Sequence, residues 1–250
     1  MKKIVLLISI LTTFGMSDTI VGGEINIGGY SHTPTGTISF EGNDIDVVDT
    51  LKWENKADVF ASFYFEHPIP LLPNIKVAYS ALSHEGAGGV DKNFEFAGKN
   101  FRSGFTVNTG IDVKMLDATL YYELLDNWVS IDVGLTAKFM DGSAYINSKK
   151  TIVSKAIEES TTFKGVLPLV YSKFRFDIPT TDIALQIEGN YVAYQENLLY
   201  DIEVGIRYTV LLGMGAEVGF KQIKLKIEDL EGFNMDNDFS GFYGKLVWDF

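Results

Sequence analysis

The sequence predicts an all-β protein whose single antiparallel sheet closes into a transmembrane β-barrel of about ten strands. Three observations lead to this fold class. Apolar and polar residues alternate with a period of two along most of the chain, the alternating segments are long, and short turns alternate with long loops. Strands of about 9–11 residues cross a bilayer at a tilt. Short periplasmic turns and long extracellular loops are typical of such barrels.

The first residues have the pattern of an export signal. A basic start and an apolar run from Ile4 to Leu11 precede the small residues Gly15 and Ser17. A buried helix or a membrane anchor would also begin with an apolar run. This run is too short for an anchor, however, and a small-x-small end is typical of a signal peptide. We expect 1–17 to be a signal peptide and 18–250 to be one barrel domain.

Ten segments have the alternation of strands, and their connections alternate in length. The expected strands are 19–30, 58–66, 75–82, 111–123, 129–139, 166–177, 183–194, 199–209, 214–226 and 239–250. Turns are expected at 67–74, 124–128, 178–182 and 210–213. Long loops are expected at 31–57, 83–110, 140–165 and 227–238, and 195–198 is short. A soluble sandwich would not separate its loop lengths in this way.

The two faces of these strands differ in chemistry, since one is apolar and the other carries most of the charges. A soluble sandwich shares this alternation, so the pattern alone does not decide between the two folds. Aromatic residues favour the membrane barrel, because they gather at both strand ends like interfacial girdles. The periplasmic girdle is expected to hold Phe65, Trp128, Phe176, Tyr208, Trp248 and Phe250. The outer girdle is expected to hold Tyr30, Phe139, Tyr191, Tyr200 and Phe242.

The chain ends on the alternating strand "GKLVWDF", with Gly244, Leu246, Trp248 and Phe250 on one face. Chain ends usually carry small or polar residues when nothing receives them. We therefore expect this face to meet lipid. A terminal Phe in register with a Trp resembles the signal by which outer-membrane assembly machinery captures the last strand of a barrel. These four residues are the expected assembly signal.

The opposite face predicts a lumen filled by ion pairs. Ten strands enclose a narrow space, and charges removed from water need partners. A freely diffusive porin is not expected, although a small, weakly cation-preferring conduit is compatible with the pattern. The expected lumen ion-pair network consists of Asp132, Lys138, Lys173, Arg175, Glu188, Asp201, Glu203, Arg207, Glu217 and Lys221.

Composition excludes two classes of function. The chain has 21 Lys and Arg against 33 Asp and Glu, for a formal net charge of −12, and no cysteine. A nucleic-acid-binding protein needs a basic surface, so no nucleic-acid partner is expected. No disulfide can form. The expected partners are outer-membrane lipid, lipopolysaccharide and the assembly machinery, and the expected state is a monomer without cofactor in the cell outer membrane.

Few residues suggest catalysis or metal binding. His84 is followed by Glu85, with Ser80 and Ser83 nearby, so a Ser/His/carboxylate site at the outer rim is conceivable. A solvated loop is the favoured interpretation. His67 is expected to cap a periplasmic turn. The acidic loops have carboxylates that Ca²⁺ could use but lack the spacing of a Ca²⁺-binding loop. No catalytic, cofactor or metal residue is predicted.

Several stretches resemble an uncharacterised family of proteobacterial outer-membrane β-barrel proteins. They are "EHPIPLLPNIKVAYSAL" at 66–82, "LYYELLDNWVSIDVGL" at 120–135, "VLPLVYSKFRFDIP" at 166–179 and "GNDIDVVDTLKW" at 42–53, with the aromatic last strand. The resemblance covers nearly the whole chain after residue 17 and combines Pro-rich turns with aromatic strand ends. It implies a barrel in the outer membrane and no particular activity.

The function expected from the sequence is therefore that of an integral outer-membrane protein with a structural, surface-interaction or narrow-channel role. The alternative is a lipid-modifying enzyme with an outer-rim His, Ser and carboxylate. A His already in contact with a Ser or a carboxylate would favour the enzyme, whereas a filled lumen would favour a binding protein over a channel.

Overall fold

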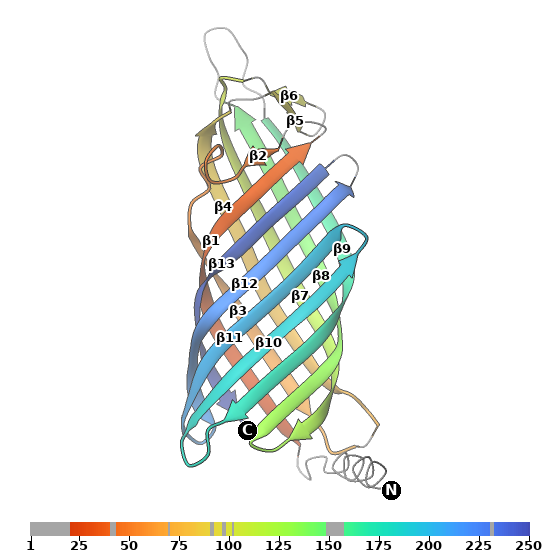
Figure 1. The fold of residues 1–250 in the computed structure, drawn as a ribbon, viewed down its shortest axis with the longest axis vertical. Coiled ribbons are helices and arrows are strands. Elements are labelled where there is room, and N and C mark those ends of the chain that lie inside the picture. Colours follow the sequence, from red (N-terminus) through yellow and green to blue (C-terminus); the bar gives the residue numbers. More distant parts are fainter. Residues whose placement is uncertain are drawn as a thin grey trace, which may run out of the picture.

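The structure, a computed structural model, describes residues 21–40, 44–69, 71–90, 93–96, 99–101, 103–148, 158–230 and 233–250. In these ranges ten long strands form one antiparallel barrel, seen in Figure 1 as steeply tilted arrows. They are β1 (Gly22–Phe40), β3 (Lys56–Glu66), β4 (Asn74–Gly89), β7 (Thr106–Asp126), β8 (Val129–Ser148), β9 (Glu158–Asp177), β10 (Ile183–Tyr194), β11 (Asn197–Leu211), β12 (Met214–Leu230) and β13 (Phe233–Asp249). The expected closed antiparallel barrel is confirmed. The expected signal peptide lies outside the described residues. Within them, no helix is long and apolar enough to cross a membrane.

The last strand closes the barrel against the first. β13 pairs with β1 from Glu24 opposite Asp249 to Phe40 opposite Phe233. Phe250 continues this ladder, because its N–H and C=O each bond to Gly23 at 2.9 Å. A closed ladder leaves no row of unpaired amide groups, which lipid could not satisfy.

The two ends of the barrel differ. The C-terminus and the short turns lie at one end, and β2 (Ile45–Asp46), β5 (Phe94–Phe96) and β6 (Lys99–Phe101) lie at the other (Figure 1). At the short-turn end His67 caps its turn as expected: its Nε2 bonds to the carbonyl of Pro73, and its Nδ1 accepts the N–H of Ile69, both at 3.2 Å. This end is the periplasmic one in an outer-membrane barrel.

The strands run further toward the extracellular end than the sequence predicted. β1 extends to Phe40, β4 to Gly89 and β8 to Ser148, and β7 begins at Thr106. Much of the expected loops 31–57, 83–110 and 140–165 is therefore barrel wall. The sequence pattern did not predict these extensions. The alternation continues in them, but the apolar residues now face inward and the polar residues face outward.

β7 shows this exchange clearly. Toward the extracellular end Ile111 and Val113 are buried inside the barrel, and Asp112 and Lys114, which alternate with them, face outward. Further along, Asp117, Thr119 and Tyr121 are buried inside, while Leu116, Leu120 and Tyr122 are exposed outside. The outer wall therefore changes from polar to apolar between Lys114 and Leu116. An apolar outer face suits lipid, and a polar outer face suits water.

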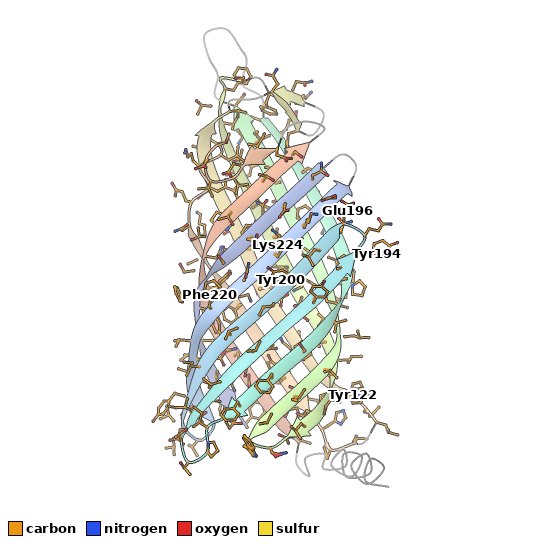
Figure 2. All side chains as sticks on the ribbon, viewed as in Figure 1. Tyr122, Tyr194, Glu196, Tyr200, Phe220 and Lys224 are labelled. Atoms are coloured by element: carbon orange, nitrogen blue, oxygen red, sulfur yellow. The ribbon has the colours of Figure 1, made fainter. Side chains whose placement is uncertain are left out.

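The same change occurs at corresponding heights elsewhere, after Phe139 on β8 and after Phe220 on β12. Figure 2 shows Phe220 on the outer surface, with Lys224 nearer the extracellular end and Tyr122 near the periplasmic end. We call the part with the apolar outer wall the membrane half. The part beyond Leu116, Phe139 and Phe220 is the extracellular half.

The extracellular half has an apolar core that loop residues complete. Val47, Leu51 and Trp53, which follow β2, are buried against inward side chains of the wall. Trp53 Nε1 donates to Thr109 Oγ1 at 2.8 Å. Gly86 and Gly88 lie within β4, not in a turn. A Cβ at Gly88 would approach the carbonyl oxygen of Thr50 to 1.8 Å, so only glycine lets this loop lie directly on the strand.

The girdle residues face lipid with one exception. Phe139, Tyr191 and Phe242 are exposed on the outside as expected, but Tyr30 is buried inside the barrel. The Tyr30 hydroxyl donates to the carbonyls of Lys221 at 3.0 Å and Phe239 at 2.5 Å. Tyr30 shares the inward face of β1 with Glu24 and Asn26, both buried, so its position in the alternation excluded it from the outer girdle.

We predict that Leu135→Arg destabilises the inserted barrel by about 2–4 kcal/mol, because Leu135 is 67% exposed within the apolar outer wall of β8. Ser143→Arg is the matched control. It faces outward on the same strand in the extracellular half and should cost less than about 1 kcal/mol. Reversible unfolding in lipid vesicles measures both values. Equal costs would mean that the apolar band does not contact lipid.

Candidate functional site

Arg207 anchors a network of charges inside the membrane half. It is fully buried, and its guanidinium bonds to both carboxylate oxygens of Glu24 at 2.8 and 3.1 Å. Its Nε donates to Glu217 at 3.1 Å, and Asp249 lies 3.6 Å from Nη1. A planar guanidinium with five donors suits such a set of carboxylates.

The network continues along β11, β12 and β13 toward the extracellular half. Lys245 lies 3.0 Å from Glu217 and 3.5 Å from Glu203, and Lys221 donates to Glu203 at 2.6 Å. The Tyr243 hydroxyl also donates to Glu217, at 2.5 Å. Each carboxylate therefore has at least two donors. This is the condition under which buried charges are tolerated.

A second group of charges lies across the lumen, on β7, β8 and β11. Lys138 forms ion pairs with Asp117 at 2.7 Å and Asp201 at 3.0 Å. Asn190 donates to Asp201 at 2.9 Å and accepts the hydroxyl of Thr136 at 2.6 Å. Lys138 thus joins strands far apart in the chain through a buried cation.

Tyrosine hydroxyls surround the carboxylate of Glu188 nearer the periplasmic end. Lys76 forms an ion pair with it, and Tyr64 and Tyr171 donate to it at 2.7 and 2.9 Å. Lys173 is buried with its Nζ 4.5 Å from the ring of Tyr64. Asp132 is also buried, and it lies directly opposite Lys173 in the ladder between β8 and β9.

The structure therefore brings the residues predicted for the lumen into three groups, around Arg207, Lys138 and Glu188, with one exception. Arg175 lies at the periplasmic rim, where its side chain is 23% exposed and pairs with Asp177 at 2.9 Å. Arg175 lies two residues nearer the periplasmic turn than Lys173, and that offset keeps it out of the central network. Of the carboxylates in the expected network, Arg207 pairs with Glu217, and its other partners, Glu24 and Asp249, lie outside that expected set.

Sequence reasoning missed several members of the network. Glu24 was not assigned to the lumen, although it alternates with Ile25 and Ile27 and shares a face with Asn26. Asp117 is flanked by Leu116 and Ala118 and could have been found by the same test. The inward tyrosines Tyr64, Tyr121, Tyr171 and Tyr243 also share a face with polar residues, so the same test would place them inside; alternation does not show that their hydroxyls donate to carboxylates.

Little free space remains inside the barrel. One cavity of about 50 Å³ lies among the charges and is lined by Lys76, Lys138 and Glu188 with their neighbours. A second cavity of about 50 Å³ lies in the extracellular half and is lined by Leu51, Trp53 and other apolar residues. Each holds a few water molecules at most, and the second is apolar.

Two histidines form a buried chain of hydrogen bonds in the extracellular half. His84 Nδ1 bonds to the carbonyl of Glu54 at 2.9 Å, and His84 Nε2 lies 2.9 Å from His32 Nδ1. A carbonyl only accepts, so a neutral His84 donates from Nδ1 and accepts at Nε2. His32 then donates from Nδ1. Its Nε2 faces Asp58 at 3.1 Å, so His32 donates to both neighbours when it carries a second proton.

The environment of the two rings favours their neutral forms. Burial lowers the pKa of His84 to about 4. Burial also lowers the pKa of His32, an effect that the hydrogen bond and charge of Asp58 oppose. Trp53 and Phe239 stack on His84 at 5.8 and 5.1 Å between ring centroids. Both histidines are therefore enclosed by aromatic side chains and the loop that follows β2.

This arrangement differs from the Ser/His/carboxylate site considered from the sequence. Glu85 faces solvent and pairs with Lys56 at 2.5 Å, away from His84. Ser83 donates its N–H and its hydroxyl to Asp58 and does not contact either histidine in the hydrogen bonds found. Among the described residues, no group of three or more His, Asp or Glu is placed to hold a metal ion.

Replacement of Arg207 by Ala should destabilise the barrel by about 3–5 kcal/mol, because it leaves Glu24 and Glu217 buried without their cation. Arg175→Ala removes the same side chain from a partly exposed pair and should cost less than about 1 kcal/mol. Urea unfolding of both variants in lipid vesicles tests this difference. Similar costs at the two positions would contradict the assignment of Arg207 as the anchor.

Lowering the pH from 7 to 5 should destabilise the protein through His84. Its pKa of about 4 in the folded state lies below the ordinary value of about 6.5, so the unfolded chain binds the proton first. The stability that the neutral ring contributes is complete above about pH 6.5 and is lost as the pH falls toward 4. The loss by pH 5 is about 2 kcal/mol.

The free energy of unfolding of wild type and His84→Gln, measured at pH 7 and pH 5, tests this prediction. The variant should lose about 2 kcal/mol less than wild type over that interval. His67→Gln, at the periplasmic turn, is the control and should behave like wild type. An unchanged acid sensitivity in His84→Gln would contradict the assignment.

Comparisons with known proteins agree with the barrel fold. No family model matches the chain, and no curated protein matches it in sequence. Among solved structures, the outer-membrane protease OmpT of Escherichia coli is similar, with a TM-score of 0.57 and 12% identity over 92% of this chain and 96% of that one. The translocator domain of the autotransporter NalP of Neisseria meningitidis gives a TM-score of 0.47 and 9% identity over 99% and 94%. At this identity the likeness to OmpT shows the outer-membrane barrel fold alone.

Proposed function

We propose that this protein is a closed barrel of the outer membrane that acts as a structural or surface-interaction element through its extracellular half. One observation carries the proposal: the interior is filled at two levels. Paired charges fill the membrane half, and an apolar core fills the extracellular half. A diffusion pore needs a continuous water path, and neither cavity of about 50 Å³ provides one.

The two levels differ in why opening them to ion flow is unfavourable. Opening the membrane half would leave charges such as Arg207 or Lys138 without partners in a medium of low dielectric constant. Opening the extracellular half would expose Val47, Leu51 and Trp53 to water. A narrow channel would need both changes at once, so a structural or binding role is favoured over conduction.

A lipid-modifying enzyme is the weaker alternative. His32 is the candidate for its base because it contacts Asp58. Its side chain has no exposed surface, and Ser83 uses its hydroxyl to bind Asp58. A catalytic base must reach the substrate proton. We therefore propose that the protein has no catalytic function.

Location and partners follow from the same proposal. The apolar outer wall of the membrane half supports a place in the outer membrane, as a monomer in contact with lipid and lipopolysaccharide. Trp248 and Phe250 face outward beside each other, with ring centroids 5.0 Å apart, as a signal read by assembly machinery would require. The resemblance of the sequence motifs to an uncharacterised proteobacterial family of outer-membrane barrels supports this location.

Planar-bilayer conductance tests the closed interior. We expect no steady current from the wild type. We also expect none from Tyr64→Ala/Tyr171→Ala, which empties part of the lumen, or from replacement of residues 45–53 by a short flexible linker. Only the combination of both changes should conduct, because the two fillings act in series. Heat-modifiable gel migration confirms that each variant is folded.

A large, stable current through the wild type would overturn the proposal and favour the channel. A current from either single variant would show that only one level seals the barrel. Silence from the folded combined variant would mean that other residues close the lumen.

A further inference from the structure

One part of the outer wall combines lysines with an apolar row at the boundary between the two halves. Tyr79, Leu116, Phe139 and Val166 pair in sequence across β4, β7, β8 and β9. All four are exposed, from 39% for Tyr79 to 56% for Val166. They line a hollow of about 510 Å³ on the outside of the barrel. In a membrane this row meets acyl chains.

The next cross-strand row toward the extracellular end is charged. It contains Lys114, Asp141 and Lys164, which pair side by side across β7, β8 and β9. Lys164 lies 2.8 Å from Asp141, in a pair whose side chains are 77% and 59% exposed. Such an exposed pair is weak and readily exchanges partners. Lys114 has no ion-pair partner within 4 Å among the described residues.

We propose that this surface, defined by Lys114, Lys164 and the apolar row below them, binds a phosphorylated acyl lipid of the outer leaflet. The phosphate lies between the two ammonium groups and displaces Asp141 from Lys164, and the acyl chains lie along Tyr79, Leu116, Phe139 and Val166. The inference rests on the proposed outer-membrane location and names a specific lipid site within it.

Charge complementarity selects this surface from the rest of the boundary. β12 also carries two outward lysines beyond the exposed Phe220, Lys224 (Figure 2) and Lys226. Lys224 forms ion pairs with Asp236 and Asp238, and Lys226 pairs with Glu228. Those lysines are already neutralised by at least as many carboxylates. On β7 to β9, Asp112 and Asp141 face outward beside the two lysines, but among the described residues only Lys164 is held in an ion pair, so Lys114 is open to a phosphate there.

The test uses the full-length barrel in phosphatidylcholine nanodiscs, with diphosphorylated lipid A as the probe and native mass spectrometry to measure retention. Lys114→Gln/Lys164→Gln should weaken lipid A retention about 10- to 30-fold, because each lysine near a membrane surface contributes about a fivefold factor. Lys224→Gln/Lys226→Gln removes the same charge elsewhere and should retain lipid A as the wild type does. Asp141→Asn should strengthen retention, because it removes the competing carboxylate.

Two further probes distinguish the chemistry. The wild type should retain dephosphorylated lipid A only as weakly as the Lys114→Gln/Lys164→Gln variant retains diphosphorylated lipid A. An excess of inorganic phosphate should not displace the phosphorylated lipid, since the apolar row holds its chains. Equal retention by wild type and Lys114→Gln/Lys164→Gln, equal losses in the control pair, or complete displacement by inorganic phosphate would each overturn the site. Failure of the wild type to enter nanodiscs would instead overturn the proposed location.

Discussion

The rest of the structure depends on the pairing of β13 with β1. A bilayer offers no water to unpaired amide groups, so a sheet is stable there only when its two edges meet. The ladder between these strands runs from Glu24 to Phe40, and Phe250 extends it to Gly23. Closure fixes one face of every strand inside, and that assignment decides which charges must find partners.

Polar side chains fill the interior of the membrane half, whereas apolar side chains fill the interior of the extracellular half. In the membrane half the outer wall is apolar, so the polar residues point inward and hold one another. In the extracellular half water takes the polar face, and Ile111, Val113 and Trp53 form an ordinary hydrophobic core inside. In β7, β8 and β12 the alternating pattern inverts once along the strand, so one sheet has an apolar outer wall in the membrane half and a polar outer wall in the extracellular half.

The sequence predicted the strands of the membrane half well because lipid and lumen impose a strict alternation on them. It predicted the outward faces of Leu135 and Trp248 and the burial of Lys138 and Glu217 for this reason. It did not predict the extracellular wall, since the alternation there keeps the same period but places apolar residues inside and polar residues outside. The pairing of Arg207 with Glu24 was also not predicted. Glu24 lies 183 residues away, and strand tilt decides which inward residues meet.

The bond between Arg207 and Glu24 has a consequence for biogenesis. Glu24 belongs to the first barrel strand and Arg207 to the third from the end, so the two meet only when the sheet has curled shut. Until then the guanidinium lacks its bidentate partner and must stay hydrated. We expect water to leave the lumen in the same cooperative event that joins the two edges. A partly closed sheet is then unfavourable both because its edge amide groups are unpaired and because its buried charges lack partners. The Arg207–Glu24 ion pair would then stabilise only the closed barrel. Release of the barrel into the membrane would therefore be close to all-or-none.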